Sequence, residues 1–354
     1  MCIIEKNDLY GLFYNGEVIV EPIYYDIDIN DKYIIASKIE NYDVLVFGIG
    51  ENYLTKDQIT VADDNYKTIN VDDVISKYDL VDIKSEIKEN EELFKKYAYY
   101  VINNDKIGDY KKHMLRLFKV IALNKKNLSE SYLLKSLTEL EVKKVSSVNY
   151  SNAVGLYQDL STKVSLDKED ANTRVAYHEL MHFIDYRINK DDDYNDYICK
   201  LGDKYYNRDA LRKLSIDERN NCSNVAIKKS SLLIEAGAEI NSARYVMNNL
   251  IETYTTGVNI YNALVYLYGE DKMNDVFFGK NTNESLMMML MDNLSIDEYK
   301  DFISSTDNLT NINSYASSTS ASKVIKYLID IYKERKGSNW DSDKKFLFII
   351  TNIK

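Results

Sequence analysis

The chain has 354 residues, of which 45% are hydrophobic and 29% charged, a composition typical of a globular protein that buries one or more cores. Its 56 acidic residues outnumber 45 basic ones, which gives a net charge of -11 and argues against nucleic acid and anionic membranes as partners. Three cysteines without metal-type spacing argue against a disulfide framework. No signal peptide or membrane-spanning run is visible, so we expect a cytoplasmic protein, or one exported without a signal peptide.

Residues 1–75 have the pattern of a β-rich module. Two apolar runs flank Asn15 and Gly16, a pair that tolerates the positive φ angles of a tight hairpin, and a second, weaker unit follows over 31–48 and 57–71. The first unit resembles WG-type β-repeats, with Tyr in place of Trp, through Tyr10-Gly11-Leu12, Gly16, Val18-Ile19, Pro22 and Tyr25-Asp26. The resemblance implies a module that binds a protein partner; the alternative is a structural sheet that covers the next domain.

The rest of the chain is predicted to be mainly helical. Residues 79–146 contain three amphipathic stretches, at 84–102, 108–123 and 129–145, each with apolar residues at helical spacing. Residues 147–354 begin with a strand at 161–167 and continue as helices, the first over about 172–188. The predicted fold class is therefore α+β, with a β-rich module, a helical middle and a mainly helical domain that includes a small sheet.

The sequence His178-Glu179-Leu180-Met181-His182 points to metal chemistry. Side chains four positions apart lie on the same face of a helix, so both histidines can bind a single ion. Zn²⁺ accepts imidazole nitrogen readily, and a carboxylate next to the first ligand can act as general base toward a water on the ion. The spacing therefore predicts a zinc site with Glu179 as the catalytic base.

A catalytic zinc site needs a third protein ligand. The best candidate is Glu235, which lies on a later helix together with Glu239 and small residues between them. One of these glutamates can bind the metal while the other orients a histidine. Glu239 and Asp185 remain alternatives for the third ligand, and the third histidine, His113, is expected to be structural.

The two motifs together resemble those of gluzincin zinc metallopeptidases. His178 to His182 followed by Glu235-Ala236-Gly237-Ala238-Glu239 is similar to the paired motifs of that class, and Asp185 resembles the aspartate of the anthrax lethal factor and Pro-Pro endopeptidase group. The resemblance implies a zincin-like metallopeptidase domain over 147–354, with Glu235 as zinc ligand and Glu179 as base. It also implies a tyrosine that stabilises the transition state, for which Tyr245 and Tyr254 are candidates, and substrate pairing along an edge strand at 161–167.

The predicted function is a zinc-dependent endopeptidase that hydrolyses a protein or peptide substrate. The alternative is a non-catalytic regulatory or recognition protein, which uses the β-module together with a zincin-like scaffold. A bacterial effector directed at a host would share the chemistry and differ in its place of action.

Overall fold

The computed structural model describes the following parts of the chain: residues 2–6, 9–14, 17–24, 26–29, 33–37, 44–48, 64–126, 130–146, 148, 154–158, 162–169, 171–185, 197–198, 206–207, 231–247, 253–278, 286–309 and 314–353. This part is mostly helical and contains a small three-stranded sheet, which agrees with the predicted α+β class. Within the described part, no helix combines the length and the apolar character that crossing a membrane requires.

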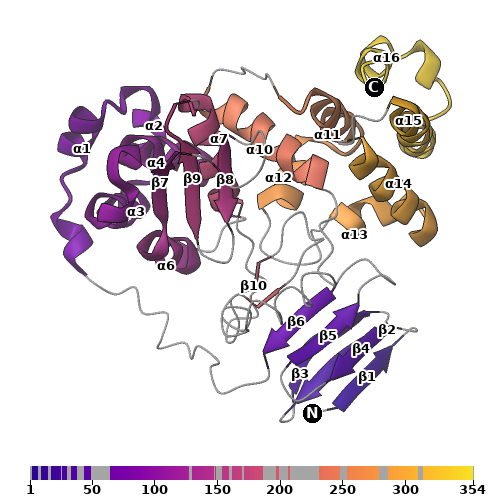
Figure 1. Cartoon of the computed structure of the whole chain (residues 1–354), viewed down its shortest axis with the longest axis horizontal. Coiled ribbons are helices and arrows are strands. Elements are labelled where there is room, and N and C mark those ends of the chain that lie inside the picture. Colours follow the sequence, from indigo (N-terminus) through magenta and orange to yellow (C-terminus); the bar gives the residue numbers. More distant parts are fainter. Residues whose placement is uncertain are drawn as a thin grey trace.

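Six strands lie in the N-terminal part (Figure 1): β1 (Cys2–Lys6), β2 (Leu9–Tyr14), β3 (Glu17–Tyr24), β4 (Asp26–Ile29), β5 (Tyr33–Ser37) and β6 (Val44–Gly48). β1, β2 and β3 form one antiparallel sheet, and β4, β5 and β6 belong to another with β11 (Tyr206–Asn207) and β10 (Tyr197–Ile198). Asn15, Gly16, residues 57–63 and most side chains of this part lie outside the described residues. The WG-type resemblance and its protein partner therefore stay predictions.

The β pattern predicted for the end of the N-terminal module is wrong, because residues 64–68 and 71–78 are helical. They form a short 3-10 helix, η2 (Asp64–Thr68), and α1 (Val71–Tyr78). The side chain of Asn70 accepts hydrogen bonds from the backbone N–H groups of Asp72 and Asp73 and so caps α1. Val71, Val74 and Ile75 are buried at helical spacing, and this packing outweighs the β-branched composition of the segment.

The helical middle is confirmed up to residue 139, although two of the predicted helices are interrupted. Its elements are η3 (Val81–Ile83), α2 (Lys84–Glu89), α3 (Glu91–Asn103), η4 (Asp105–Tyr110), α4 (Lys111–Arg116), α5 (Phe118–Asn124) and α6 (Glu130–Glu139). The following segment was predicted as the end of a helix, but it is strand β7 (Glu141–Val145). A parallel partner 22 positions later in the chain pairs with its backbone, and helical periodicity cannot reveal such a partner.

The small sheet has the order β7-β9-β8, with β8 (Gly155–Gln158) antiparallel to β9 (Lys163–Asp167). The strand predicted at 161–167 exists as β9, but it is the central strand and pairs on both sides. The prediction that this segment is an edge strand for substrate is therefore wrong. The outer strand beside the next helix is β8. The predicted domain boundary between 146 and 147 also divides this sheet, so the segments on either side of it belong to one structural unit.

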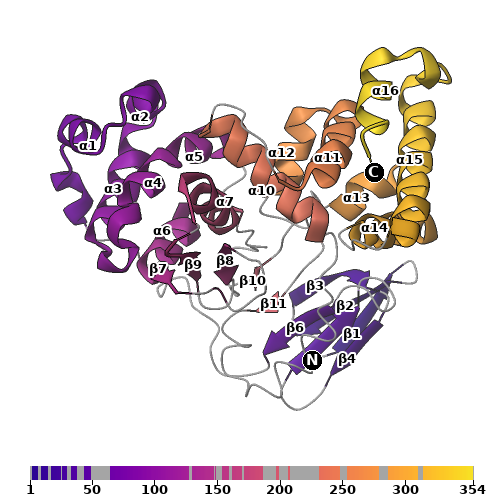
Figure 2. The ribbon, with the colours of Figure 1, turned by 45° about the horizontal axis from the view of Figure 1, so that its top comes forward.

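The remaining elements are α7 (Thr173–Ile184), α10 (Ser231–Tyr245), α11 (Thr255–Tyr268), α12 (Glu270–Phe278), α13 (Leu286–Met291), α14 (Ile296–Asn308), α15 (Ser314–Lys336), η7 (Trp340–Ser342) and α16 (Lys344–Ile350). Figures 1 and 2 both place α7 between the small sheet and α10, with the C-terminal helices beyond α10. One continuous core runs from α1 to α16 and includes the fully buried rings of Phe94, Phe183 and Phe277. The helix that carries the predicted motif is thus held on both sides.

Candidate metal centre

Helix α7 places the first motif inside the protein. Its start is fixed by Asn172, whose side chain accepts a hydrogen bond from the backbone N–H of Val175 at 3.1 Å. Every residue from Ala176 to Ile184 is buried, because α7 packs on the sheet with one face and on α10 with the other. The polar side chains of His178, Glu179 and His182 are therefore 6%, 8% and 4% exposed and must find partners within the protein.

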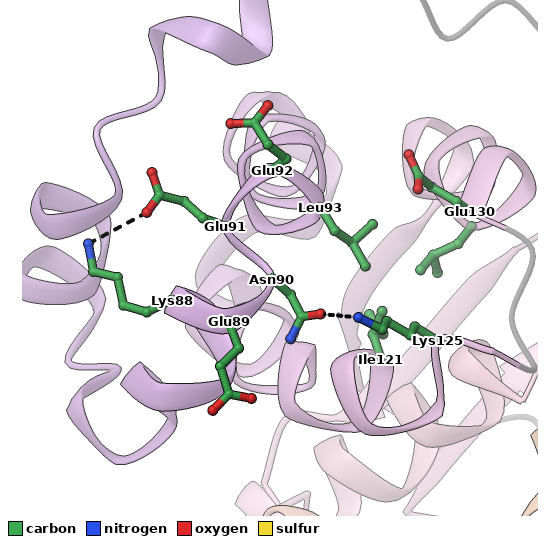
Figure 3. Close-up of a pocket in the computed structure, with 10 residues that line it drawn as sticks. Lys88, Glu89, Asn90, Glu91, Glu92, Leu93, Ile121, Lys125 and Glu130 are labelled. Atoms are coloured by element: carbon green, nitrogen blue, oxygen red, sulfur yellow. Dashed lines mark hydrogen bonds and ion pairs between the residues drawn. The ribbon is translucent and has the colours of Figure 1, made fainter.

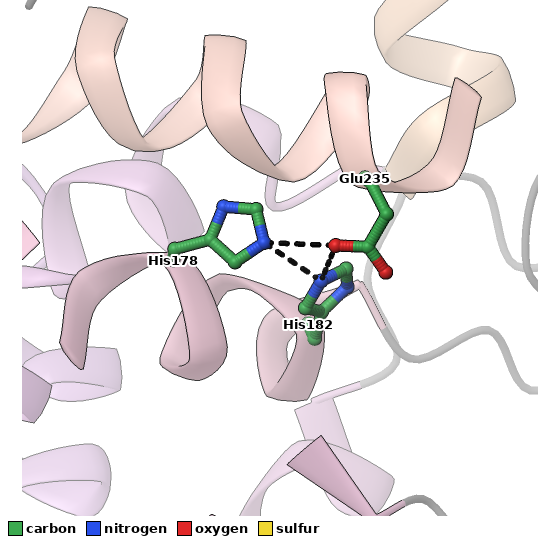
Figure 4. Close-up of side chains that lie close together, drawn as sticks. All are labelled: His178, His182 and Glu235. Carbon is green, nitrogen blue, oxygen red and sulfur yellow. Dashed lines mark hydrogen bonds and ion pairs between the residues drawn. The ribbon is translucent and has the colours of Figure 1, made fainter. Parts of the chain in front are cut away.

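Helix α10 supplies these partners, and Figure 4 shows Glu235 pointing from α10 toward both histidines of α7. Glu235 Oε2 lies 3.0 Å from His178 Nε2 and 3.1 Å from His182 Nε2. The two Nε2 atoms are 3.2 Å apart. Three atoms from two helices that are distant in sequence thus form a nearly equilateral triangle, as the sequence predicted.

Loss of one proton from His178 would turn this triangle into a set of metal ligands. His178 Nδ1 lies 3.1 Å from Glu239 Oε2, and a proton kept on Nδ1 by this carboxylate would leave a lone pair on Nε2 of the neutral imidazole. That lone pair would converge with those of His182 and Glu235, and a cation between them would bind all three.

The dimensions of the triangle fit zinc. Ligand atoms about 2.0–2.1 Å from a tetrahedral zinc ion lie about 3.3–3.4 Å apart, slightly more than the 3.0–3.2 Å separations found here. Two imidazole nitrogens and one carboxylate oxygen are also a known ligand set of catalytic zinc. The residues present therefore fit the predicted cofactor.

The alternatives for the third ligand occupy other positions. Glu239 is fully buried and faces Nδ1 of His178, the side of the ring opposite the triangle. Asp185 caps the end of α7 and acts electrostatically on Tyr261 of α11. The metal-ligating group found among the described residues consists of His178, His182 and Glu235, which favours Glu235 as third ligand. His113 packs against the rings of Tyr110 and Tyr177, as expected for a structural histidine.

A second layer of contacts surrounds His178. The sequence predicted that one of the two glutamates would orient a histidine, but it did not predict Arg174 and Thr253. Arg174 Nη1 donates to Glu239 Oε1 at 2.8 Å and to Thr253 Oγ1 at 2.9 Å. The backbone N–H of Thr253 also points at Glu239 Oε1, at 3.4 Å. Arg174 lies one helical turn before His178, so its spacing was a usable signal.

Glu179 lies where α7 meets strand β8. A Cβ atom added to Gly155 would come within 2.7 Å of both Glu179 Cγ and Glu179 Oε1, so the strand backbone runs directly against this carboxylate. The charge of Glu179 also acts on His178 and on Tyr254 and raises the pKa of each. The predicted base is therefore close to the ligand triangle and to the outer strand of the sheet.

Of the two tyrosine candidates, Tyr254 is at the site. Its ring stacks on His178, with centroids 5.5 Å apart and an interplanar angle of 17°, and its hydroxyl is hydrogen-bonded to Glu235. Burial, followed by the charges of the site glutamates, raises the pKa of Tyr254, so the phenol keeps its proton. Tyr245 ends α10, where its hydroxyl accepts a hydrogen bond from Asn274 of α12 and its ring faces Arg244, so it interacts with α12 and with its neighbour in α10.

The carboxylates give the site a strong preference for positive charge. Burial lowers the pKa of His178, but hydrogen bonds to Glu235 and Glu239 and the nearby negative charges outweigh it and raise that pKa to about 10. Burial alone would raise the pKa of Glu235. His182 and His178 outweigh this effect and hold that pKa well below the ordinary value. The carboxylates that stabilise the proton on His178 would also stabilise a metal cation bound there.

A separate surface hollow lies between α2, α3, α5 and α6 (Figure 3). Its lining residues are Lys88, Glu89, Asn90, Glu91, Glu92, Leu93, Ile121, Lys125, Glu130 and Leu133. Lys88 pairs with Glu91, and Lys125 donates to Asn90, so its lysines bind neighbouring side chains. We assign this hollow no ligand.

The residues and their geometry are the basis on which we assign a candidate metal centre. Comparison with known protein families, with characterised proteins and with solved structures finds no match to this chain. The resemblance to gluzincins stays a prediction from the two sequence motifs.

Proposed function

We propose that this chain is a zinc-dependent endopeptidase, in which His178, His182 and Glu235 hold the ion and Glu179 is the general base. The observation that carries the proposal is the triangle of Nε2, Nε2 and Oε2 atoms, with sides of 3.0–3.2 Å, in which both histidines are buried and Glu235 is 34% exposed. A zinc ion held there would supply Lewis acidity toward a carbonyl oxygen and would make a water molecule acidic enough to attack at neutral pH.

Glu179 does the proton work in this proposal. Its carboxylate takes a proton from the attacking water and passes it to the amide nitrogen that leaves, so that one C–N bond breaks and one C–O bond forms. Its low exposure and the close approach of Gly155 support this role, because they hold the carboxylate inside the protein beside strand β8.

Tyr254 is the donor that we assign to the oxygen of the scissile carbonyl. The phenol keeps its proton because its pKa is raised, and its ring is held face to face with His178. Tyr254 is 42% exposed as a residue, so an incoming substrate can reach it. Donors of this kind stabilise the negative charge that develops in the transition state.

Strand β8 is the element that we assign to substrate binding. It is one of the two outer strands of the small sheet, and Gly155 brings its backbone against Glu179. An extended peptide that pairs with this strand would lie alongside the general base. We thus retain the prediction that the substrate pairs with a strand of this sheet, but we assign it to β8 in place of residues 161–167.

The test is elemental analysis and cleavage profiling of the full chain. We expect about one zinc per chain, peptide cleavage by the zinc-loaded protein, and a loss of turnover of about 10²–10⁴-fold in Glu179→Gln with the zinc retained. Glu92→Gln, a change of the same kind at an exposed position of α3, serves as control. Zinc binding without cleavage of any peptide would favour the non-catalytic alternative, and absence of zinc binding would contradict the proposed enzyme.

A further inference from the structure

We propose that Arg174 is a positioning residue, which fixes the metal-binding face of His178 and the start of α11 at the same time. The inference rests on the proposed metal function of the site. Its basis is the pair of contacts that one nitrogen of Arg174 makes with Glu239 Oε1 at 2.8 Å and with Thr253 Oγ1 at 2.9 Å.

The first contact acts on His178 through Glu239. Glu239 is fully buried, and the side chain of Arg174 is only 17% exposed, so this ion pair lies largely outside water. One oxygen of Glu239 receives Arg174 while the other faces His178 Nδ1 at 3.1 Å. Arg174 therefore fixes the rotation of the carboxylate, and the carboxylate in turn fixes the ring of His178 with Nε2 toward Glu235 and His182.

The second contact acts on Tyr254 through its neighbour in sequence. Tyr254 has φ 52° and ψ 32°, the left-handed conformation that a residue with a side chain rarely adopts. Such a conformation persists only where surrounding contacts hold it. Thr253 is held on both sides, since its hydroxyl accepts from Arg174 and its N–H points at Glu239. The ring that stacks on His178 is thereby tied to the same arginine.

Arg174 touches none of the three ligand atoms, so its effect should be on affinity and geometry. Loss of a residue that orients a metal-binding histidine typically weakens metal affinity by about 10- to 100-fold. We expect a weakening in this range for Arg174→Met, which keeps an unbranched side chain as far as the position of Nε and removes the charge and the hydrogen bonds. Arg174→Lys keeps the charge and one donor, and we expect it to restore most of the affinity.

The control is Arg244→Met. Arg244 lies in the last turn of α10 and pairs with Glu270 at 2.8 Å, with a side-chain exposure of 26%. Arg244→Met also removes an arginine–glutamate ion pair, one whose glutamate is 54% exposed, on a neighbouring part of the same fold. Its zinc affinity should equal that of the unchanged chain.

The experiment measures zinc affinity by competition with a chromophoric chelator, and the visible absorption spectrum of the cobalt-loaded full chain. Weaker zinc binding and an altered cobalt spectrum in Arg174→Met, with Arg244→Met unchanged and Arg174→Lys partly restored, would support the proposal. Equal affinity and an identical cobalt spectrum in Arg174→Met would overturn it while leaving the metal site intact. If the unchanged chain binds neither metal, the proposed function fails, and the role of Arg174 fails with it.

Should Arg174→Met fail to fold, Thr253→Val takes its place. This change removes only the hydroxyl that accepts from Arg174, at a position that is not fully buried. We expect a smaller loss of zinc affinity and a changed cobalt spectrum. Unchanged values for both would overturn the link between Arg174 and the start of α11.

Discussion

Zinc affinity should continue to rise with pH well above neutrality, because His178 has to release a proton to bind the ion. The pKa of His178 in the metal-free chain is raised to about 10: burial lowers it, but the hydrogen bonds to Glu235 and Glu239 and the surrounding negative charges prevail. Both ring nitrogens then carry protons at neutral pH. A metal ion requires the lone pair on Nε2, so one proton leaves for each ion bound.

The change of zinc affinity with pH follows from the release of this one proton. Below the raised pKa, each unit of pH changes the affinity about tenfold, so zinc should bind about 100-fold more tightly at pH 9 than at pH 7. A histidine with an unperturbed pKa of about 6.5 has lost its proton by about pH 7.5, and its zinc affinity would be flat above that pH. The interval from pH 7.5 to 9 therefore separates the two cases.

The same proton also stabilises the metal-free fold. A group whose pKa is raised by folding contributes stability that is fully present below its unfolded pKa, about 6.5, and disappears as the pH passes the folded value. For His178 this loss runs up to about pH 10. The metal-free chain should therefore become less stable over this interval, while the zinc-loaded chain, in which the proton has already gone, should lack this contribution.

The assay is zinc competition with a chelator at several pH values, together with calorimetry at pH 8 in two buffers of different ionisation enthalpy. We expect about one proton released per zinc bound. Glu239→Gln removes one of the carboxylates that raise the pKa of His178, so its affinity should level off at a lower pH. A flat affinity between pH 7.5 and 9, with no proton release at pH 8, would refute the reasoning.

Two further predictions concern the reaction. Gly155→Ala should place a Cβ 2.7 Å from Glu179 Cγ and Oε1 and displace that carboxylate, so turnover should fall with zinc binding retained, at a stability cost of about 1–3 kcal/mol. Gly257→Ala, equally crowded but by Leu232, should show the stability cost in thermal unfolding without the fall in turnover; equal turnover loss in both would contradict a specific role for Gly155. Tyr254→Phe keeps the ring stacked on His178 and removes the hydroxyl, so kcat should fall by about 10²–10³-fold with zinc affinity retained; an unchanged kcat would exclude Tyr254 as donor.

The sequence predicted the local part of the site well. The shared face of His178 and His182 follows from the helical period, and the apolar residues around them predict a buried helix. Glu235 was predicted from its residue type and its motif, since no local rule brings it to the histidines from a helix more than fifty positions later. Its placement depends on how α7 and α10 pack, which is a property of the whole core.

The errors have a similar origin. The alternation in 161–167 predicts a strand, but it cannot distinguish an edge strand from a central one, because that depends on β7, whose segment reads as helical. Arg174 was missed although it precedes His178 by one turn, because an arginine in the first turn of a helix is ordinarily a solvated residue. Its role follows only from Glu239 and Thr253, which reach it from other elements.

The facing polar residues of α7 and α10 help to determine how the two helices align along their length. Along α7, Arg174, His178 and His182 follow one another at one-turn steps, and along α10 Glu235 and Glu239 do the same in the opposite direction. Arg174 meets Glu239, His178 meets both glutamates, and His182 meets Glu235. A slip of one turn that brought Glu239 to His182 would place the apolar Ala243 opposite Arg174, and the largely buried guanidinium would lose its carboxylate. Because removing one partner of a buried ion pair costs about 3–5 kcal/mol, Arg174 disfavours this slip and so helps to set the register in which the three ligand atoms converge.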